Sequence, residues 1–194
     1  MGPIYSETSQ SQCMISIAEP RYRNQNWKLN MKTLYFIGGT MGVGKSTMSQ
    51  QLKLQLHNSV FLDGDWCWDA HPFQVTEETK EMVLENICAV LNNFLKCSVY
   101  DNIIFCWVMH EQSIMDAIIS RLDITGCRFI AISLLCSEEN LIQRLKKDIA
   151  AGVRSNDVIE RSVNRIPLYQ TLHTIKIDTS DKSAVEIARE IAAL

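Results

Sequence analysis

The sequence predicts an α/β fold in which a five-stranded parallel sheet carries helices on both faces. Short apolar runs alternate with helical patterns five times along the chain, which is typical of strands joined by crossover helices. The runs at 103–108 and 129–135 are apolar without interruption, as expected of strands covered on both sides. The chain has 194 residues, enough for one full core, and the domain is expected to span residues 31–194.

The first strand and the first helix enclose a glycine-rich loop. The strand is expected at 34–37, and the helix that follows the loop carries Met48, Leu52 and Leu56 on one face. The loop reads Gly39, Thr40, Met41, Gly42, Val43, Gly44, Lys45 and Ser46, which fits the G-x-x-x-x-G-K-[ST] pattern of a phosphate-binding loop. Because a strand precedes the pattern and a helix follows it, the sequence predicts a P-loop NTPase fold.

Each residue type in this loop has a chemical reason. Glycine lets the main chain approach phosphates closely and take positive φ, so that backbone N–H groups converge on the anion. Lys45 is expected to reach the β- and γ-phosphates, and Thr47 the α-phosphate. Ser46 is expected to hold a magnesium ion that bridges the phosphates. The expected cofactors are therefore ATP and Mg²⁺.

The second strand is expected at 60–62 and ends in the carboxylate pair Asp63 and Asp65. An aromatic loop follows, and Thr76 then N-caps a long helix whose apolar residues keep the helical period. The remaining expected elements are a strand at 103–108, a helix at 113–122, a strand at 129–135, a helix at 138–149 capped by Ser137, a helix opened by a capping box of Asp157 and Glu160 and interrupted at Pro167, a strand at 175–178 and a helix at 184–194.

Residues 1–30 show no helical or strand periodicity and are expected to be a disordered or non-native N-terminal extension. The net charge is −3 and no basic run occurs, which argues against nucleic acid as a partner. No apolar run is long enough to span a membrane. The seven cysteines form no C-x-x-C pair, so they are expected to be reduced thiols in a cytoplasmic protein. A monomer and a dimer both remain open.

Four stretches together resemble the small-molecule P-loop kinases. They are the loop at 39–46, the run Phe61-Leu62-Asp63-Gly64-Asp65, the arginine-bearing break at 150–154, and Ile177-Asp178-Thr179 before the last helix. The resemblance covers about residues 31–194 and includes the gluconate, shikimate, adenylylsulfate and chloramphenicol kinases, built on the nucleoside-monophosphate-kinase fold. It implies a small lid at the break, and the Leu-Asp-Gly-Asp element is particularly similar to the gluconate and adenylylsulfate kinases.

Other P-loop classes fit less well. A GTPase needs an Asn-Lys-x-Asp guanine motif, which the sequence lacks. An AAA-type or transport ATPase would place an acidic pair at the end of the third strand, where this chain has Val108-Met109-His110-Glu111. Without that acidic residue, magnesium is expected to depend on Ser46, the phosphates and water, with help from Asp63.

Positioning and charge neutralisation supply most of the catalysis of phosphoryl transfer. Asp63 is therefore the candidate for taking the proton of the acceptor hydroxyl or for holding a magnesium-bound water, and Asp65 for binding acceptor hydroxyls. The alternative for the pair is a solvated turn or an N-cap. Arg154, in the lid-like break, is the candidate for neutralising the transition state, with Arg144, Arg161 and Arg165 nearby in sequence. Salt-bridged surface arginine is the alternative for each of them.

Other residues are assigned on weaker signals. Asp178 and Thr179 resemble the loop that frames adenine, and Arg144 is grouped with them on the nucleotide side. His110 and Glu111, just past the third strand, either contact the acceptor or form a structural pair. Trp66, Trp68 and Phe73 either line the acceptor pocket or pack the loop.

These observations predict an ATP- and Mg²⁺-dependent kinase of a small hydroxyl-bearing molecule. The alternative is a nucleotide-binding regulatory ATPase that has no small-molecule acceptor. From Lys45 to Arg121 the chain contains no arginine, although this interval should hold the acceptor. Because arginine suits the recognition of phosphate and carboxylate, we expect a non-anionic acceptor such as a nucleoside, sugar or amino sugar. The alternative is that lid arginines such as Arg154 or Arg161 bind an anionic acceptor from above.

Overall fold

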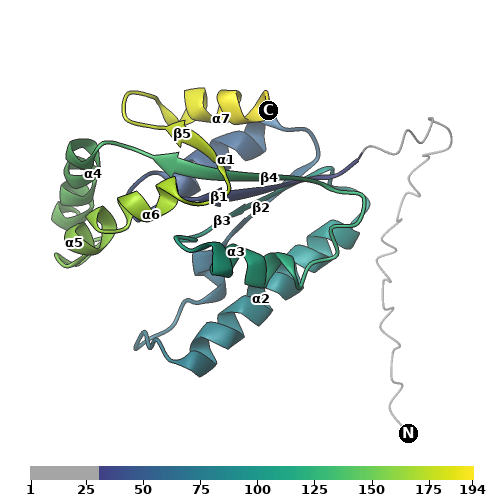
Figure 1. Ribbon diagram of the computed structural model, residues 1–194, viewed down its shortest axis with the longest axis horizontal. Helices are drawn as coiled ribbons and strands as arrows, with labels where there is room; N and C mark the ends of the chain where they lie inside the picture. Colours follow the sequence, from purple (N-terminus) through teal and green to yellow (C-terminus); the bar gives the residue numbers. More distant parts are fainter. Residues whose placement is uncertain (1–30) are drawn as a thin grey trace, which may run out of the picture.

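The computed structural model describes residues 31–194, so the expectation for residues 1–30 lies outside the described residues. Five parallel strands form one sheet in the order β2-β3-β1-β4-β5 (Figure 1). The strands are β1 (Thr33–Gly38), β2 (Ser59–Asp63), β3 (Asn102–Cys106), β4 (Arg128–Leu135) and β5 (Ile175–Asp178). This confirms the predicted fold class.

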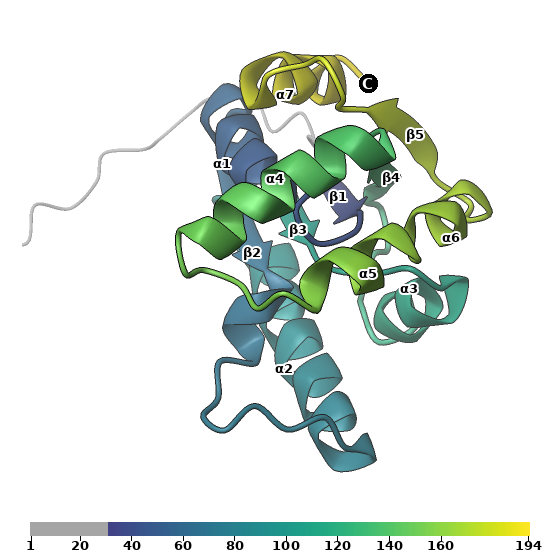
Figure 2. The same ribbon diagram turned by 90° about the vertical axis from the view of Figure 1, so that its left-hand side faces the viewer.

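Helices cover both faces of the sheet. One face carries α1 (Lys45–Gln55) and α7 (Ala184–Ala192), and the other carries α2 (Glu77–Lys96) and α3 (Gln112–Ile119) (Figure 1). Three further helices, α4 (Glu138–Ala150), α5 (Val158–Val163) and α6 (Ile166–Gln170), lie across the carboxyl ends of the strands (Figure 2). Ligands of open parallel sheets bind at these ends, so α4 to α6 are placed to cover the site.

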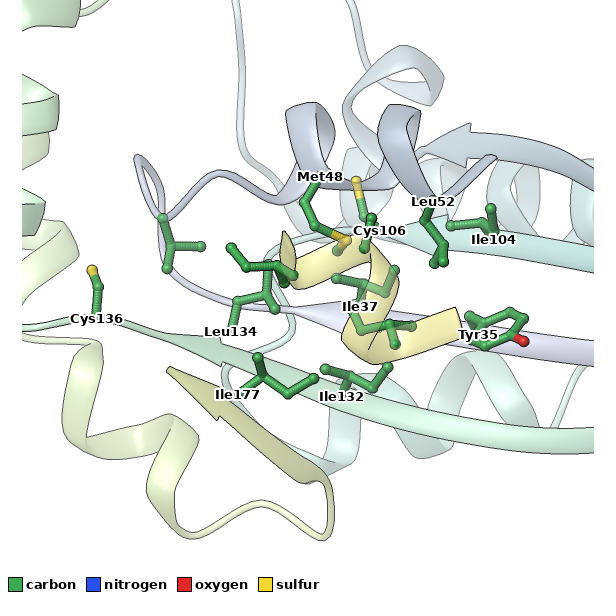
Figure 3. Packing of buried hydrophobic residues seen from close by; sticks show 14 of the residues in the cluster. Tyr35, Ile37, Met48, Leu52, Ile104, Cys106, Ile132, Leu134, Cys136 and Ile177 are labelled. Atoms are coloured by element: carbon green, nitrogen blue, oxygen red, sulfur yellow. The ribbon is translucent and has the colours of Figure 1, made fainter. Parts of the chain in front are cut away.

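The sheet divides the core into two clusters because successive side chains of a strand point to opposite faces. In β1, Tyr35 and Ile37 belong to the cluster under α1 and α7, whereas Leu34 and Phe36 belong to the cluster over α2 and α3. Met48 and Leu52 of α1 pack on the first cluster, together with residues of β1, β3, β4 and β5 such as Ile104, Ile132 and Ile177 (Figure 3). The predicted apolar faces of α1 and α2 are thus buried.

Most of the expected helix boundaries are confirmed. Thr76 caps α2 in a capping box with Thr79, and Ser137 caps α4. Pro167 lies at the start of α6, where the preceding helix ends and a new one begins. In residues 31–194, none of the helices combines the length and the apolar character needed to cross a membrane.

The predicted capping box of Asp157 and Glu160 is wrong. Asp157 has helical φ and ψ of −66° and −12°, and its side chain accepts no hydrogen bond from the N-terminal turn of α5. The carboxylate instead accepts a hydrogen bond from Ser155 and forms an ion pair of 2.9 Å with Arg161. An N-cap normally has extended φ and ψ, which Asp157 lacks.

Candidate functional site

The P-loop joins the end of β1 to the start of α1 in a conformation that suits an anion. Gly42 and Gly44 have φ of 81° and 103°, which only glycine adopts readily. A Cβ on Gly42 would lie 2.6 Å from Leu145 of α4, so the loop also needs glycine there for packing. Gly44 is the N-cap residue of α1, and a Cβ added there would meet no atom within 4 Å, so the positive end of the helix is free to receive an anion.

Lys45, Ser46 and Asp63 lie together beside this loop. The Nζ atom of Lys45 donates to the Thr40 carbonyl at 3.1 Å, and burial lowers the pKa of this lysine. Ser46 Oγ donates to Asp63 Oδ2 at 2.5 Å. The second carboxylate oxygen of Asp63 accepts a hydrogen bond of 3.1 Å from the Asp65 N–H, so Asp63 also caps the short 3₁₀ helix η1 (Gly64–Cys67). Asp63 therefore acts as an N-cap, as the alternative expected, and the same side chain is also bonded to Ser46 of the P-loop.

This pair of oxygen ligands fits a magnesium ion that is bound mainly through phosphates. Mg²⁺ usually keeps several waters and takes one or two protein oxygens besides the substrate phosphates. Ser46 and Asp63 offer one hydroxyl and one carboxylate at the loop that would hold those phosphates. Among residues 31–194, no group of three or more His, Cys, Asp and Glu side chains is placed to hold a metal ion.

The end of β3 lacks the acidic residue that many P-loop ATPases have there. Cys106 is paired with Asp63 of β2 and with Ile37 of β1, and it is fully buried. Burial, followed by the Asp63 charge, raises the pKa of its thiol to about 12. A cysteine sulfur is a soft ligand, whereas Mg²⁺ takes oxygen ligands, so Cys106 does not replace the missing carboxylate.

A small cavity of about 180 Å³ lies on the other side of the P-loop. Its lining includes Thr47, Arg144 and Lys182, the last of which was not expected from the sequence. Arg144 donates to the carbonyl of Val43 at 3.1 Å and to Thr179 Oγ1 and O at 3.1 and 2.7 Å. This arginine therefore holds the P-loop against the segment that follows β5.

Asp178 and Thr179 do not line that cavity. Thr179 is fully buried and serves as the hydrogen-bond partner of Arg144. Asp178 accepts hydrogen bonds from the Ser180 hydroxyl and N–H, which lower the pKa of its carboxyl group. Both residues therefore shape the loop that follows β5. The cavity itself is lined by Arg144 and Lys182.

Arg154 follows the end of α4, as the lid-like break predicts. Its Nε atom forms an ion pair of 3.0 Å with Asp148, which agrees with the salt-bridged alternative for this conformation. Burial lowers the pKa of Lys45, and the Arg154 charge adds to that shift; burial raises the pKa of Asp65, and the Arg154 charge opposes that shift. Arg154 therefore lies within electrostatic reach of the site without lining its cavities.

An apolar cavity of about 480 Å³ is lined by residues of η1, the N-terminal half of α2, α3 and the α5–α6 segment. We call it the α2–α3 pocket. The side chains most relevant to ligand binding there are Asp65, Trp68, Phe73, Trp107, His110 and Arg165. Asp65 joins this pocket to the P-loop because it lies two residues after Asp63. Four of these six residues, Asp65, Trp68, Phe73 and His110, are ones that the sequence assigns to the acceptor side. Arg165 was grouped with the lid arginines, and Trp107 was given no role.

Trp107 lies directly after β3 and packs over Gly64. A Cβ on Gly64 would lie 2.5 Å from Cγ of this tryptophan, so glycine at the middle of Asp63-Gly64-Asp65 makes room for the indole ring. Trp107 Nε1 donates to Asp65 Oδ1 at 3.1 Å. Burial and the Asp63 charge raise the pKa of Asp65. The sequence did contain a signal for Trp107. It lies at the end of the third apolar run, and the ends of adjacent parallel strands meet at one edge of the sheet, beside Asp63-Gly64-Asp65.

Two residues assigned to the acceptor side do not line the α2–α3 pocket. Trp66 is 59% exposed and packs edge-on against Phe61, with ring centroids 5.2 Å apart. Glu111 lies 3.5 Å from His110 Nε2, and its side chain is 60% exposed, so it matches the alternative of a structural pair. His110 itself lines the pocket, and burial, followed by the Arg165 charge, lowers its pKa.

Two arginines reach the α2–α3 pocket from α5 and from the start of α6. Arg161 and Arg165 are four residues apart and therefore project from one side of the segment. These arginines lie outside the interval from Lys45 to Arg121, and their position agrees with the alternative in which lid arginines reach the acceptor side. The lack of arginine between Lys45 and Arg121 therefore does not by itself decide the charge of the acceptor.

Comparisons with known proteins agree with this architecture. A family model described as an AAA domain matches residues 36–162. No curated protein matches the chain. Similar solved structures include the tunicamycin resistance protein of Deinococcus radiodurans, with 19% identity, TM-score 0.62 and coverage of 84% of this chain and 94% of that chain. A gluconokinase from Sinorhizobium meliloti 1021 has 17% identity, TM-score 0.62 and coverage of 84% and 91%. The APS kinase of Mycobacterium tuberculosis, in complex with AMPPNP and APS, has 13% identity, TM-score 0.56 and coverage of 84% and 96%.

Proposed function

The chain belongs to the AAA domain family, and from that premise we propose that it is an ATP-dependent kinase of a small hydroxyl compound. One observation carries the proposal. The tripeptide Asp63-Gly64-Asp65 joins the two halves of a kinase site, because Asp63 is hydrogen-bonded to Ser46 of the P-loop and Asp65 lines the α2–α3 pocket. A carboxylate placed between a phosphate site and a second pocket suits transfer of a phosphoryl group between them.

In the proposed reaction an acceptor hydroxyl oxygen bonds to the γ-phosphorus of ATP as the bond to the β-phosphate oxygen breaks. Lys45 and the N–H groups of the P-loop bind the phosphates, and Arg144 and Thr47 lie on the nucleotide side. Ser46 and Asp63 would hold Mg²⁺, which supplies positive charge to the phosphate oxygens. Arg154, within electrostatic reach of Lys45, is proposed to leave Asp148 and add charge to the transition state when the lid closes.

The proton of the hydroxyl is proposed to pass to Asp65. Both oxygens of Asp63 have partners, namely Ser46 and the Asp65 N–H, which favours the metal-holding role among the two considered for Asp63. Asp65 lines the pocket, and its raised pKa makes it a stronger base than an exposed aspartate.

Reduced cysteines support a cytoplasmic location, since all six that the structure describes are free thiols.

The alternative function is that of a regulatory ATPase without an acceptor. Two observations favour the kinase. The end of β3 lacks the acidic residue expected of an AAA-type or transport ATPase, and a pocket large enough for a small molecule lies beside Asp65. The test is ADP release by the full chain with and without panels of hydroxyl compounds. A kinase releases ADP in proportion to the phosphorylated compound formed, whereas a regulatory ATPase releases ADP at the same rate with every panel.

A further inference from the structure

The α2–α3 pocket is lined by more positive than negative side chains, and Arg165 differs from the other cations there in its surroundings. Its ionised side chains are Lys80, Arg161, Arg165 and Asp65. Lys80 forms an ion pair of 2.7 Å with Glu77, and Arg161 one of 2.9 Å with Asp157. Across the part of the chain that the structure describes, no carboxylate pairs with Arg165.

Arg165 is half-buried at the N-terminal end of α6. Its charge affects the groups around it, because it contributes to lowering the pKa of His110 and opposes the effect of burial on the Tyr169 hydroxyl. Its pKa effects thus reach the imidazole of His110 after β3 and the phenol of Tyr169 on its own helix, and the other charged side chains of the pocket are Asp65, Lys80 and Arg161. A cation that is partly removed from water gains from an anionic partner, and within residues 31–194 no carboxylate forms an ion pair with Arg165.

The other walls of the pocket are apolar and partly aromatic. The rings of Trp68 and Phe73 lie 4.8 Å apart, and Val83 of α2 and Ile114 of α3 complete this side. Trp107 is fixed by Gly64 and by its hydrogen bond to Asp65. One pocket therefore combines apolar aromatic surface with the Asp65 carboxylate and the Arg165 guanidinium.

We propose that the acceptor has an apolar or planar body that carries an anionic group, a carboxylate or a phosphate, and that Arg165 binds this group. The proposal rests on the proposed kinase function and deepens it. Asp65 then binds the hydroxyl end of the acceptor, and the tryptophans contact its body. Arginine suits both anions because its guanidinium presents two N–H groups in parallel.

A rival role for Arg165 is contact with the γ-phosphate of ATP. The two roles differ in which kinetic constant depends on the side chain. An acceptor-binding arginine sets the half-saturating concentration of the acceptor, whereas an arginine on the γ-phosphate sets the turnover rate and the affinity for ATP.

The first experiment separates a metabolite extract on an anion-exchange resin and offers both fractions to the full chain with γ-labelled ATP. We expect labelled organic product from the retained fraction. Product formed only from the unretained fraction would overturn the proposal and leave the kinase standing, whereas release of inorganic phosphate alone with both fractions would overturn the kinase itself. Treating the retained fraction with phosphatase beforehand distinguishes the two anions, because an acceptor that carries a carboxylate survives and one that carries a phosphate monoester does not.

The second experiment compares Arg165→Gln, Arg165→Lys and the control Arg189→Gln, an exposed arginine on α7. For Arg165→Gln we expect at least about a tenfold rise in the half-saturating amount of the retained fraction, with the KM for ATP unchanged. Arg165→Lys should recover part of that loss, and Arg189→Gln should match the wild type. A fall in turnover without a change in acceptor saturation would overturn the proposal in favour of the γ-phosphate role. Thermal melts of all three variants separate misfolding from loss of binding.

Discussion

Ser46 Oγ and Asp63 Oδ2 share a hydrogen bond of 2.5 Å, which links the first turn of α1 to the end of β2. The other oxygen of the same carboxylate accepts the Asp65 N–H at 3.1 Å. Asp63 therefore sets the position of a phosphate-side hydroxyl and, through η1, the position of a side chain in the α2–α3 pocket. Replacing Asp63 tests both connections.

Asp63→Asn and Asp63→Ala should separate charge from capping. Asparagine keeps an oxygen for the Asp65 N–H but removes the charge that would help to hold Mg²⁺, so we expect turnover to fall by about 10²-fold with little change in unfolding free energy. Alanine also removes the cap, which should lower the free energy of unfolding by about 1–2 kcal/mol. The measurements are kinase rates and urea unfolding. Wild-type turnover in Asp63→Asn would exclude the residue from the reaction.

Lys45→Ala should abolish transfer without unfolding the domain. Burial lowers the pKa of Lys45, which means that the folded protein gains little from its charge, and the Thr40 carbonyl is its hydrogen-bond acceptor. We expect an unchanged circular dichroism spectrum, a melting temperature close to that of the wild type, and no labelled product. Residual transfer at the wild-type rate would contradict the assignment of residues 39–46 as the phosphate site.

Gly64→Ala should damage the acceptor side alone. The new methyl group would lie 2.5 Å from Cγ of Trp107, so the indole must move and its hydrogen bond to Asp65 breaks. We expect acceptor-dependent turnover to fall while the affinity for ATP, measured by calorimetry, stays unchanged. Trp107→Phe is the matched variant, since it removes the N–H and keeps most of the ring. Equal loss of ATP affinity in Gly64→Ala would show that the two sides are not separable.

The imidazole of His110 should titrate below its usual range. Burial and the Arg165 charge lower its pKa, so the folded protein keeps this histidine neutral while the unfolded chain takes up a proton near pH 6.5. The stability contribution is present above pH 6.5 and is lost as the pH falls below it. Unfolding free energy measured between pH 7.5 and about 5 should fall more steeply in the wild type than in His110→Gln.

The same titration tests the position of Arg165. Removing the guanidinium in Arg165→Gln should raise the pKa of His110, which can be followed by NMR of the imidazole protons. An unchanged His110 pKa would place the arginine too far away to act on the pocket.

Much of the fold was predictable because local signals agree with it. The alternation of apolar strands and amphipathic helices determined the parallel sheet, and the capping residues Thr76 and Ser137 marked two helix starts to the residue. Asp157 misled because a capping pattern does not specify the backbone conformation. Its competing partners Ser155 and Arg161 are equally local.

The P-loop side of the site was also predictable, whereas the acceptor side depended on tertiary placement. Trp107 is the last aromatic residue of an apolar run, and only the β2–β3 register, which pairs Asp63 with Cys106, brings it over Gly64. Arg165 lies a hundred residues after Asp65 and reaches the pocket because α5 and α6 fold back across the strand ends. A count of arginines between Lys45 and Arg121 could not include it.

The most direct test of the kinase assignment is to follow the γ-phosphate itself. The full chain is incubated with γ-labelled ATP, magnesium and an unfractionated metabolite extract, and the labelled species are separated by mass. Label in an organic phosphate ester, absent when Lys45→Ala replaces the wild type, is the result that we expect. Label found only in inorganic phosphate, at a rate that the extract does not change, would contradict the kinase assignment and favour a regulatory ATPase.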